Sequence, residues 1–435
     1  MTSVGIAGLI LLVGVLVYLV LGAPISISVG IASVLAIFSI LGPENALQTA
    51  AQRMFTGMNS FTLLAIPFFI LAGVIMNNGG IAMRLVNCAK VMAGRIPGSL
   101  AQTNVLANMM FGSISGSAVA AAAAVGSTMG PMQEKEGYDK PFSAAVNIAS
   151  APTGMLIPPS NTLIVFSLVS GGTSIAALFM AGYIPGILWG LGCMIVAFFM
   201  AKRRGLKADE RVSFKVAIKV FWDAIPSFFL IILVIGGIVG GIFTATEGSA
   251  IAVVYALLLS FLYRTIQIKE LPRILLESTR TTAIVIFLIG VSTIMSWVMA
   301  FTGIPAFIAD SLLGFTNSFV VILIIMNIVL LIVGTFMDPT PAILIFTPIF
   351  LPIVLQFGMD PVHFGIMVVF NLSIGTITPP VGPVLFVGAR VAKLKLEHVI
   401  RPLLPFFAVT AFVLLLVTYI PFLSTWLPTA LGFMK

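Results

Sequence analysis

The chain has 435 residues, of which 60% are hydrophobic and only 8% are charged, whereas ordinary soluble domains carry roughly 25% charged residues. Its mean hydropathy is +1.17, and apolar runs recur that reach the roughly 18 residues needed to cross a bilayer. This composition excludes a soluble globular domain. The net charge of +8 comes from basic residues in short loops beside apolar stretches. That placement indicates membrane topology and lipid headgroups, not nucleic acid.

In chain order, the apolar segments predict two halves of equal make-up. The first Lys or Arg is Arg53, so the opening apolar stretch lacks the basic start of a cleavable signal peptide and is interpreted as the first crossing. The expected crossings are 4–21, 24–42, 62–80, 142–171, 175–200, 224–244, 247–263, 282–300, 364–387 and 402–423. Two further segments, 102–131 and 319–352, hold a central run of small or polar residues and are interpreted as re-entrant hairpins. Residues 1–200 and 224–435 would each contain about five crossings and one hairpin, joined by a cytoplasmic linker and amphipathic connection over 201–223.

Two motifs recur in the two halves. The stretch 153–159 (TGMLIPP) has its counterpart 221 residues later at 374–380 (IGTITPP), and 112–117 (GSISGS) corresponds to 334–339 (GTFMDP). Apolar segments that are interrupted by Gly and Pro at matching places of two halves are typical of secondary transporters, which bind substrate and ions at those breaks.

Basic residues change sides between the halves. The loop before the first hairpin carries Arg84, Lys90 and Arg95, and 388–401 carries four further basic residues, whereas the corresponding loops 303–318 and 170–174 have no Lys or Arg. Because cytoplasmic loops carry the excess of Lys and Arg, equivalent loops would lie on opposite faces of the membrane. The sequence therefore predicts an all-α polytopic membrane protein with two inverted-topology repeats and both termini in the periplasm, with Arg53 as the one exception.

The Pro-Pro pairs at 158–159 and 379–380 predict unwound backbone within two crossings. Proline has no N–H and clashes with a continuing helix, and non-helical backbone at membrane depth is tolerated only where it is buried in protein or lines a polar cavity. The freed carbonyls are natural ligands for a sodium ion, and the N-terminus of a half-helix attracts a carboxylate. The alternative is a simple proline kink, but two kinks in register, each beside a hairpin rich in small polar residues, favour a binding site.

Asp338 is the strongest single candidate for a functional residue, because apolar sequence flanks it on both sides. A charged side chain at membrane depth costs on the order of 2.5–3.5 kcal/mol, which a cation, a proton or a hydrogen-bond network must offset. Its repeat counterpart is Gly116, so the charge belongs to one half only.

Other polar residues are weaker candidates. Glu277 and Arg280 lie in an amphipathic stretch that enters a crossing, where snorkelling to the interface is the default. Asn108 and Asn147 precede the breaks of the first half and would join its site only as additional ligands.

No pattern in the sequence is typical of an enzyme. The cysteines Cys88 and Cys193 and the histidines His363 and His398 have no metal-ligand spacing, and no Gly-x-x-x-x-Gly-Lys-Ser/Thr phosphate loop is present. We therefore expect neither ATP hydrolysis nor an organic cofactor.

The segments FGSISGSA (111–118) and LIPPS (156–160), together with Asp338-Pro339 and TPP (378–380), resemble the large membrane subunit of tripartite ATP-independent periplasmic (TRAP) transporters. The resemblance covers essentially the whole chain. It implies an elevator-type importer in the bacterial inner membrane that is driven by about two or more sodium ions. Its cargo would be an organic anion such as a C4-dicarboxylate, sialic acid or another sugar acid. It also implies two partners, a separate small four-helix membrane subunit and a periplasmic substrate-binding protein.

The resemblance also assigns the candidate site residues. The candidates for the substrate carboxylate are Ser115, Ser117, Ser160 and Asn161. The candidates for sodium are Ser113, Gly116, Thr153, Gly154 and Pro158 in the first half, and Gly334, Thr335, Asp338, Gly375, Thr376 and Thr378 in the second.

The sequence alone leaves two other functional classes open, an ion exchanger and a channel. A Na⁺/H⁺ antiporter also uses crossed broken helices with an intramembrane carboxylate, although it normally has a second ionisable residue at the crossing. A channel fits less well, because closed hairpins at the midplane suit alternating access better than a continuous pore.

Overall fold

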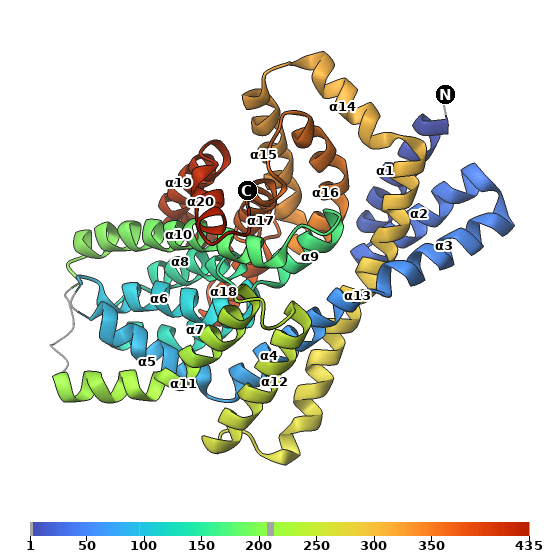
Figure 1. Cartoon of the computed structure of the whole chain (residues 1–435). Coiled ribbons are helices and arrows are strands. Elements are labelled where there is room, and N and C mark those ends of the chain that lie inside the picture. Colours follow the sequence, from blue (N-terminus) through green and yellow to red (C-terminus); the bar gives the residue numbers. More distant parts are fainter. Residues whose placement is uncertain (1–2, 95, 207–212, 435) are drawn as a thin grey trace.

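The computed structural model describes residues 3–94, 96–206 and 213–434, and all regular elements in these ranges are helices (Figure 1). Eight helical segments of the described chain are long and apolar enough to cross a membrane. The predicted all-α polytopic fold is therefore confirmed. Arg95 and residues 207–212 of the predicted linker lie outside the described residues.

The first half contains ten α-helices and two short 3₁₀ helices in its described part. They are α1 (Ser3–Val20), α2 (Ile25–Leu41), α3 (Pro43–Met58), η1 (Phe61–Leu64), α4 (Ala65–Asn78), α5 (Ile81–Ala93), α6 (Ser99–Ser115), α7 (Ala118–Lys135), α8 (Lys140–Ser150), η2 (Ala151–Met155), α9 (Asn161–Val169) and α10 (Ile175–Arg203).

The second half contains ten α-helices and one 3₁₀ helix among its described residues. They are α11 (Phe214–Val239), α12 (Ala245–Leu262), η3 (Ile268–Glu270), α13 (Leu271–Thr302), α14 (Ile304–Phe315), α15 (Phe319–Phe336), α16 (Pro339–Gln356), α17 (Pro361–Gly375), α18 (Pro383–Val391), α19 (Leu396–Tyr419) and α20 (Phe422–Ala430).

One succession of elements occurs in both halves. A helical hairpin (α6–α7 or α15–α16) is followed by a broken helix (α8–η2–α9 or α17–α18) and then by a long helix (α10 or α19). Both breaks contain the expected proline pair, and both pairs are joined by a cis peptide bond. The order of elements thus agrees with two repeats, while their inverted orientation in a membrane stays a prediction.

The expected crossings did not include four short helices that the structure contains: α3, α5, α14 and α20. Of these, α3 is too polar to be recognised as a crossing, since it begins Pro-Glu-Asn and buries only Ala46 and Ala50 in the protein. Its Arg53, the exception to the charge pattern, stacks over the ring of Trp297 on α13 at 5.6 Å from the ring centroid, a favourable cation–π contact.

Glycines allow each hairpin to pack directly on the break of its own half. A Cβ atom on Gly154 would lie 2.2 Å from the Cα of Gly112, and one on Gly375 would lie 2.5 Å from the Cα of Gly334. Neither approach leaves room for a side chain. The motifs that repeat in the sequence are therefore the places where the backbones of hairpin and broken helix cross.

Buried asparagines also link each hairpin to its broken helix. In the first half the Asn108 Nδ2 donates to the Asn147 Oδ1 at 3.0 Å, and the Asn147 Nδ2 donates to the carbonyl of Ala122 on the other arm of the hairpin at 2.8 Å. In the second half the Asn371 Nδ2 donates to the Asn327 Oδ1 at 2.7 Å. Asn108 and Asn147 therefore hold the hairpin on α8, and the second pair was not predicted from the sequence.

A long helix forms one wall of the molecule. Figure 1 shows α13 beside α2 and α3 at one end and beside α4 at the other, and these helices pack on one another. The hairpins and broken helices gather on the other side. The outward face of α1 presents Leu12 and Leu16, which are 63% and 52% exposed, as expected of a surface in contact with lipid.

Candidate substrate and ion site

A cavity of about 750 Å³ lies where the two hairpin tips, the two breaks, α4 and α13 meet. The first turns of five helices line it, because Ile25 belongs to α2, Ala118 to α7, Asn161 to α9, Thr340 to α16 and Val384 to α18. Helix N-termini carry a partial positive charge. The N–H groups at the starts of α16 and α18 are already bonded, from Thr340 to Asp338 and from Val384 to the Thr376 carbonyl. The cavity is therefore suited to an anion chiefly at the starts of α7 and α9, beside the breaks that the sequence predicts.

The tip of the first hairpin is built from Ser115, Gly116 and Ser117, and all three line the cavity. Gly116 has a φ of +60°, a left-handed conformation that ends α6. The Ser117 Oγ accepts from the N–H of Ala120 at 3.3 Å and so caps α7. The Ser115 Oγ makes only long contacts of 3.4 Å to Ser117. Ser115 is therefore the tip hydroxyl that is most available to a ligand.

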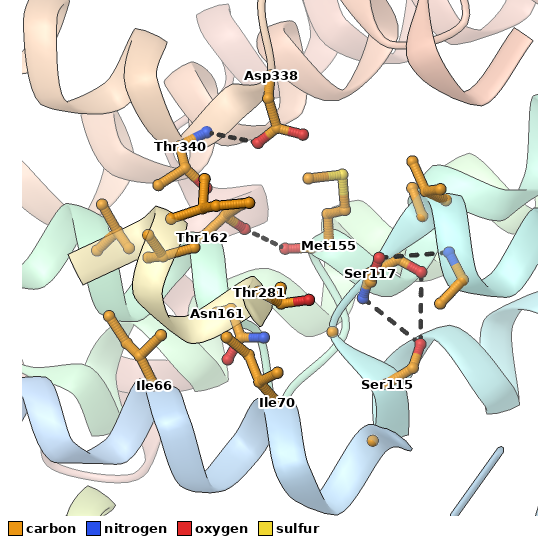
Figure 2. Close-up of a pocket in the computed structure, with 18 of the residues that line it drawn as sticks. Ile66, Ile70, Ser115, Ser117, Met155, Asn161, Thr162, Thr281, Asp338 and Thr340 are labelled. Carbon is orange, nitrogen blue, oxygen red and sulfur yellow. Dashed lines mark hydrogen bonds between the residues drawn. The ribbon is translucent and has the colours of Figure 1, made fainter. Parts of the chain in front are cut away.

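The first-half break brings Asn161 and Thr162 to the cavity but not Ser160. The Ser160 hydroxyl is completely buried, donates to the carbonyl of Met155 and lies 2.8 Å from the Thr162 Oγ1. Asn161 comes next to the hairpin tip, since a Cβ on Gly116 would lie 3.1 Å from the Asn161 Nδ2. Of the four predicted substrate residues, three line the same cavity, shown in Figure 2: Ser115, Ser117 and Asn161. Ser160 does not line it.

Asp338 lies at the tip of the second hairpin, on the opposite side of the cavity from Ser115 and Ser117 (Figure 2). Its Oδ1 accepts from the N–H of Thr340 at 3.1 Å and caps α16. Asp338 is exposed and lines the cavity. A ligand in the cavity therefore has access to this charge.

The remaining first-half sodium candidates lie in the last turn of α6 and in the break that follows α8. The Ser113 Oγ donates to the Met110 carbonyl at 2.8 Å, and the Thr153 Oγ1 donates to the Ser150 carbonyl at 2.7 Å. Gly154 packs on the hairpin backbone, and Pro158 is half of the cis pair. Both hydroxyl oxygens keep lone pairs for an ion.

The second-half candidates surround the end of α17. The Thr376 and Thr378 hydroxyls donate to the carbonyls of Ser373 and Ile374, each at 2.7 Å, and the Thr335 carbonyl accepts from the N–H of Gly382 at 3.1 Å. A Cβ on Gly382 would lie 2.8 Å from the carbonyl oxygens of both Thr376 and Thr378. The carbonyl oxygens of Thr376 and Thr378 therefore lie together beside Gly382, a residue that was not predicted.

The wall opposite the hairpins comes from α4 and α13, and the sequence did not assign it to the site. Each helix contributes a stripe at helical spacing. The stripe of α4 comprises Ile66, Ile70, Val74 and Asn77, and that of α13 comprises Glu277, Thr281, Ile284, Val285 and Leu288. Both stripes are apolar at one end and polar at the other. The i, i+4 spacing is visible in the sequence, but which apolar face lines a cavity is not.

Comparison with known proteins identifies the family. A family model described as "Tripartite ATP-independent periplasmic transporter, DctM component" matches residues 12–423.

The chain belongs to this family.

The resemblance noted in the sequence is thus confirmed, and because the family consists of transporter subunits, the protein is a multi-pass transport subunit and not an enzyme.

Three relatives illustrate the range of similarity. The chain is 54% identical to "Uncharacterized protein YgiK" of Salmonella typhimurium, over 95% of each protein. It is 42% identical to the isethionate TRAP transporter permease protein DctMQ of Oleidesulfovibrio alaskensis, over 93% of this chain and 64% of that one. It is 37% identical to the C4-dicarboxylate TRAP transporter large permease protein DctM of Vibrio cholerae, over 97% of each.

A solved structure shares the fold at low sequence identity. The YdaH transporter of Alcanivorax borkumensis aligns with a TM-score of 0.66 at 13% identity, covering 87% of this chain and 90% of that one.

Proposed function

We propose that this TRAP large subunit imports an organic anion across the bacterial inner membrane together with sodium ions. The observation that carries the proposal is the cavity itself, because two hairpin tips, two broken helices and the first turns of five helices converge on one space. Relatives named for isethionate and for C4-dicarboxylates support an organic anion as the cargo.

Sodium coupling is supported by the charges around the cavity. No Lys, Arg or His of the described chain lines it, whereas the carboxylates of Glu277 and Asp338 do. An anion entering such a space needs cations beside it, since burying an unpaired charge is costly. Sodium ions at the oxygen groups of the two breaks would supply that charge, so that anion and cations bind together. Asp338 and the carbonyls of Thr376 and Thr378 are the second-half ligands of this proposal.

The transporter would work with two partner proteins. A periplasmic substrate-binding protein would deliver the anion, and a separate small four-helix membrane subunit would complete the membrane complex. The large subunit would move its hairpins and broken helices as a unit against the wall formed by α4 and α13, the elevator movement that the resemblance implies.

Reconstitution tests the proposal. Proteoliposomes with the large and small subunits, the binding protein and an inward sodium gradient should take up labelled isethionate or a C4-dicarboxylate, and replacing sodium with choline should abolish the uptake. Liposomes that lack the large subunit are the control. Uptake that is equally fast without a sodium gradient would contradict sodium coupling.

A Na⁺/H⁺ exchanger is the second candidate, because the cavity holds two carboxylates, Asp338 and Glu277. An exchanger would acidify or alkalinise liposomes containing this chain alone when a sodium gradient is applied. A pH-sensitive dye inside the vesicles measures this flux. Sodium-driven proton movement without any organic anion would replace the import proposal with exchange.

A further inference from the structure

A second cavity, of about 510 Å³, lies where α7, the start of α8 and the end of α18 meet. Its volume is in the range of small-molecule sites. The helix α7 lines the substrate and ion cavity with Ala118 in its first turn and the second cavity with Glu134 in its last turn. In the same way, α18 lines the first cavity with Val384 and the second with Arg390. The second cavity therefore lies toward the opposite ends of these two helices.

Three buried polar side chains that line the second cavity have an atom without a hydrogen-bond partner in the described chain: the Asn104 Nδ2, the Gln133 Oε1 and the Ser143 Oγ. These residues are 1%, 0% and 7% exposed. The other end of each amide is held in place. The Asn104 Oδ1 accepts from Asn108 at 3.0 Å, and the Gln133 Nε2 donates to the Leu100 carbonyl at 3.0 Å. Because buried polar groups are normally hydrogen-bonded, these atoms suit a ligand that offers both acceptors and a donor.

Basic side chains outnumber acidic ones in the lining of the second cavity. Lys140 is paired there with Glu134 at 2.9 Å. Arg390 and Lys393 also line the cavity, and neither takes part in the two ion pairs of the described chain. Two positive charges are thus left without an acidic partner, so the cavity favours an anionic group.

The backbone brings Lys393 to this cavity in an unfavourable conformation. Its φ is +56°, in the left-handed region, and it follows Ala392, the C-cap of α18. Helices usually carry glycine at this position, because a Cβ is disfavoured there. The turn alone would favour glycine, whereas a lysine adds a positive charge to the cavity.

We propose that the second cavity binds a phosphate group that has a hydroxyl beside it, as in glycerol phosphate. Arg390 and Lys393 bind the phosphate oxygens, for which a guanidinium has matching geometry. The Asn104 amide and the Ser143 hydroxyl donate to the ligand, and the Gln133 amide oxygen accepts from its hydroxyl. Because α7 and α8 belong to the first half of the chain and α18 to the second, the ligand joins the two halves.

This chemistry has two sources, a soluble polyol phosphate and the headgroup of phosphatidylglycerol. The excess of basic residues in 388–401 predicts that this end of the molecule faces the cytoplasm, where both sources are present. The inference does not depend on which anion the transporter imports.

The test measures binding to the full-length protein in detergent. The probes are glycerol phosphate, phosphatidylglycerol in mixed micelles, and, as uncharged or zwitterionic controls, glycerol and phosphatidylcholine. The dependence of the thermal unfolding temperature on probe concentration gives a dissociation constant, because a ligand that binds only the folded state stabilises it by mass action. We expect a phosphate probe to stabilise the protein and the controls not to. Stabilisation by glycerol phosphate would assign a soluble ligand, and stabilisation by phosphatidylglycerol alone would assign a lipid headgroup.

Arg390→Gln should raise the dissociation constant about tenfold or more, because it removes a hydrogen bond between charged groups. Lys395→Gln is the matched control, since Lys395 is an exposed basic residue two positions after Lys393 that does not line the cavity. Its effect should stay within about twofold, because salt screens exposed charges outside the site.

Ser143→Ala separates binding from folding. It should raise the dissociation constant about threefold or more, because it removes one hydrogen bond to the ligand. The unfolding temperature of the ligand-free protein should not fall, since the hydroxyl that is removed has no partner in the described chain. Ser115→Ala should leave phosphate binding unchanged, because Ser115 lines only the substrate and ion cavity.

Three results would overturn the proposal. If neither phosphate probe stabilises the protein, the second cavity is not a phosphate site. Equal weakening in Arg390→Gln and Lys395→Gln would indicate a general effect of surface charge. Loss of phosphate binding in Ser115→Ala would place the probe in the substrate and ion cavity instead.

Discussion

Asp338 and Asp360 form a natural pair for separating a functional carboxylate from a structural one. Each precedes a proline at the start of a helix, and each accepts a backbone N–H two residues later, from Thr340 at 3.1 Å and from Val362 at 2.7 Å. Only Asp338 lines the cavity. The capping geometry is thus shared, and the access to a ligand is not.

Asp338→Asn should lower sodium-dependent uptake at least about tenfold while the protein remains folded. Asn caps a helix about as well as Asp, so the change removes the charge and keeps the cap. Asp360→Asn should leave uptake within about twofold of the parent, because that carboxylate does not line the cavity. Uptake and its sodium dependence are measured in proteoliposomes, and an equal loss in both variants would contradict a coupling role for Asp338.

Ser115→Ala should raise the substrate concentration for half-maximal uptake by about tenfold, because a hydrogen bond to a charged group contributes roughly 1.5–3 kcal/mol. Ser160→Ala should change it less than about threefold, since the Ser160 hydroxyl is buried behind the cavity and bonds to Met155. Substrate titrations of both variants measure these two effects. A larger effect at Ser160 would show that the break rearranges when substrate binds.

At the scale of elements, the crossing of each hairpin with its break depends on glycine. Gly154→Ala would place a Cβ 2.2 Å from the Gly112 backbone, and no flexible side chain can move aside there. We expect a large loss of folded protein in size-exclusion chromatography. Gly130→Ala, in the helix α7, would place its Cβ in open space with no atom within 4 Å, so this variant should purify normally and transport at the parent rate. Equal yields of the two variants would argue against a backbone crossing at Gly154.

The asparagine pairs stabilise the same elements through hydrogen bonds. Asn147→Ala removes the bonds from α8 to both arms of the first hairpin. It also leaves buried groups unpaired, at a cost of about 1–3 kcal/mol each. The thermal unfolding temperature of the detergent-purified protein should therefore fall. Asn45→Ala, at an exposed position of α3, is the control that should leave it unchanged, and a similar fall in both variants would contradict the proposed link.

At the scale of the whole molecule, the charge pattern predicts which side each loop occupies. Fusions of alkaline phosphatase after the C-terminus should be active, because the enzyme functions in the periplasm, and a fluorescent protein inserted after Gly205 should fluoresce in the cytoplasm. This follows from the excess of basic residues in cytoplasmic loops. The reverse pattern would overturn the inverted repeat while leaving the helical fold intact.

The sequence by itself determined the membrane class, the two hairpins, the two breaks and the choice of Asp338 as a candidate. These features depend on local chemistry: long apolar runs, glycine and proline where a helix cannot continue, and a carboxylate with apolar neighbours. The sequence also located Ser115, Ser117 and Asn161, because the residues that interrupt a helix are those that can face its end.

Only the tertiary structure decided what surrounds those residues. Ser160 and Thr162 are two positions apart, yet one hydroxyl is turned into the protein and the other residue lines the cavity, because the direction of each side chain follows from the path of the break. Glu277, for which the sequence predicts only snorkelling, also lines the cavity, since α13 packs beside α4. The Asn327–Asn371 pair joins α15 to α17, which are separated in the chain by α16. Such contacts depend on how distant helices pack, which local sequence does not encode.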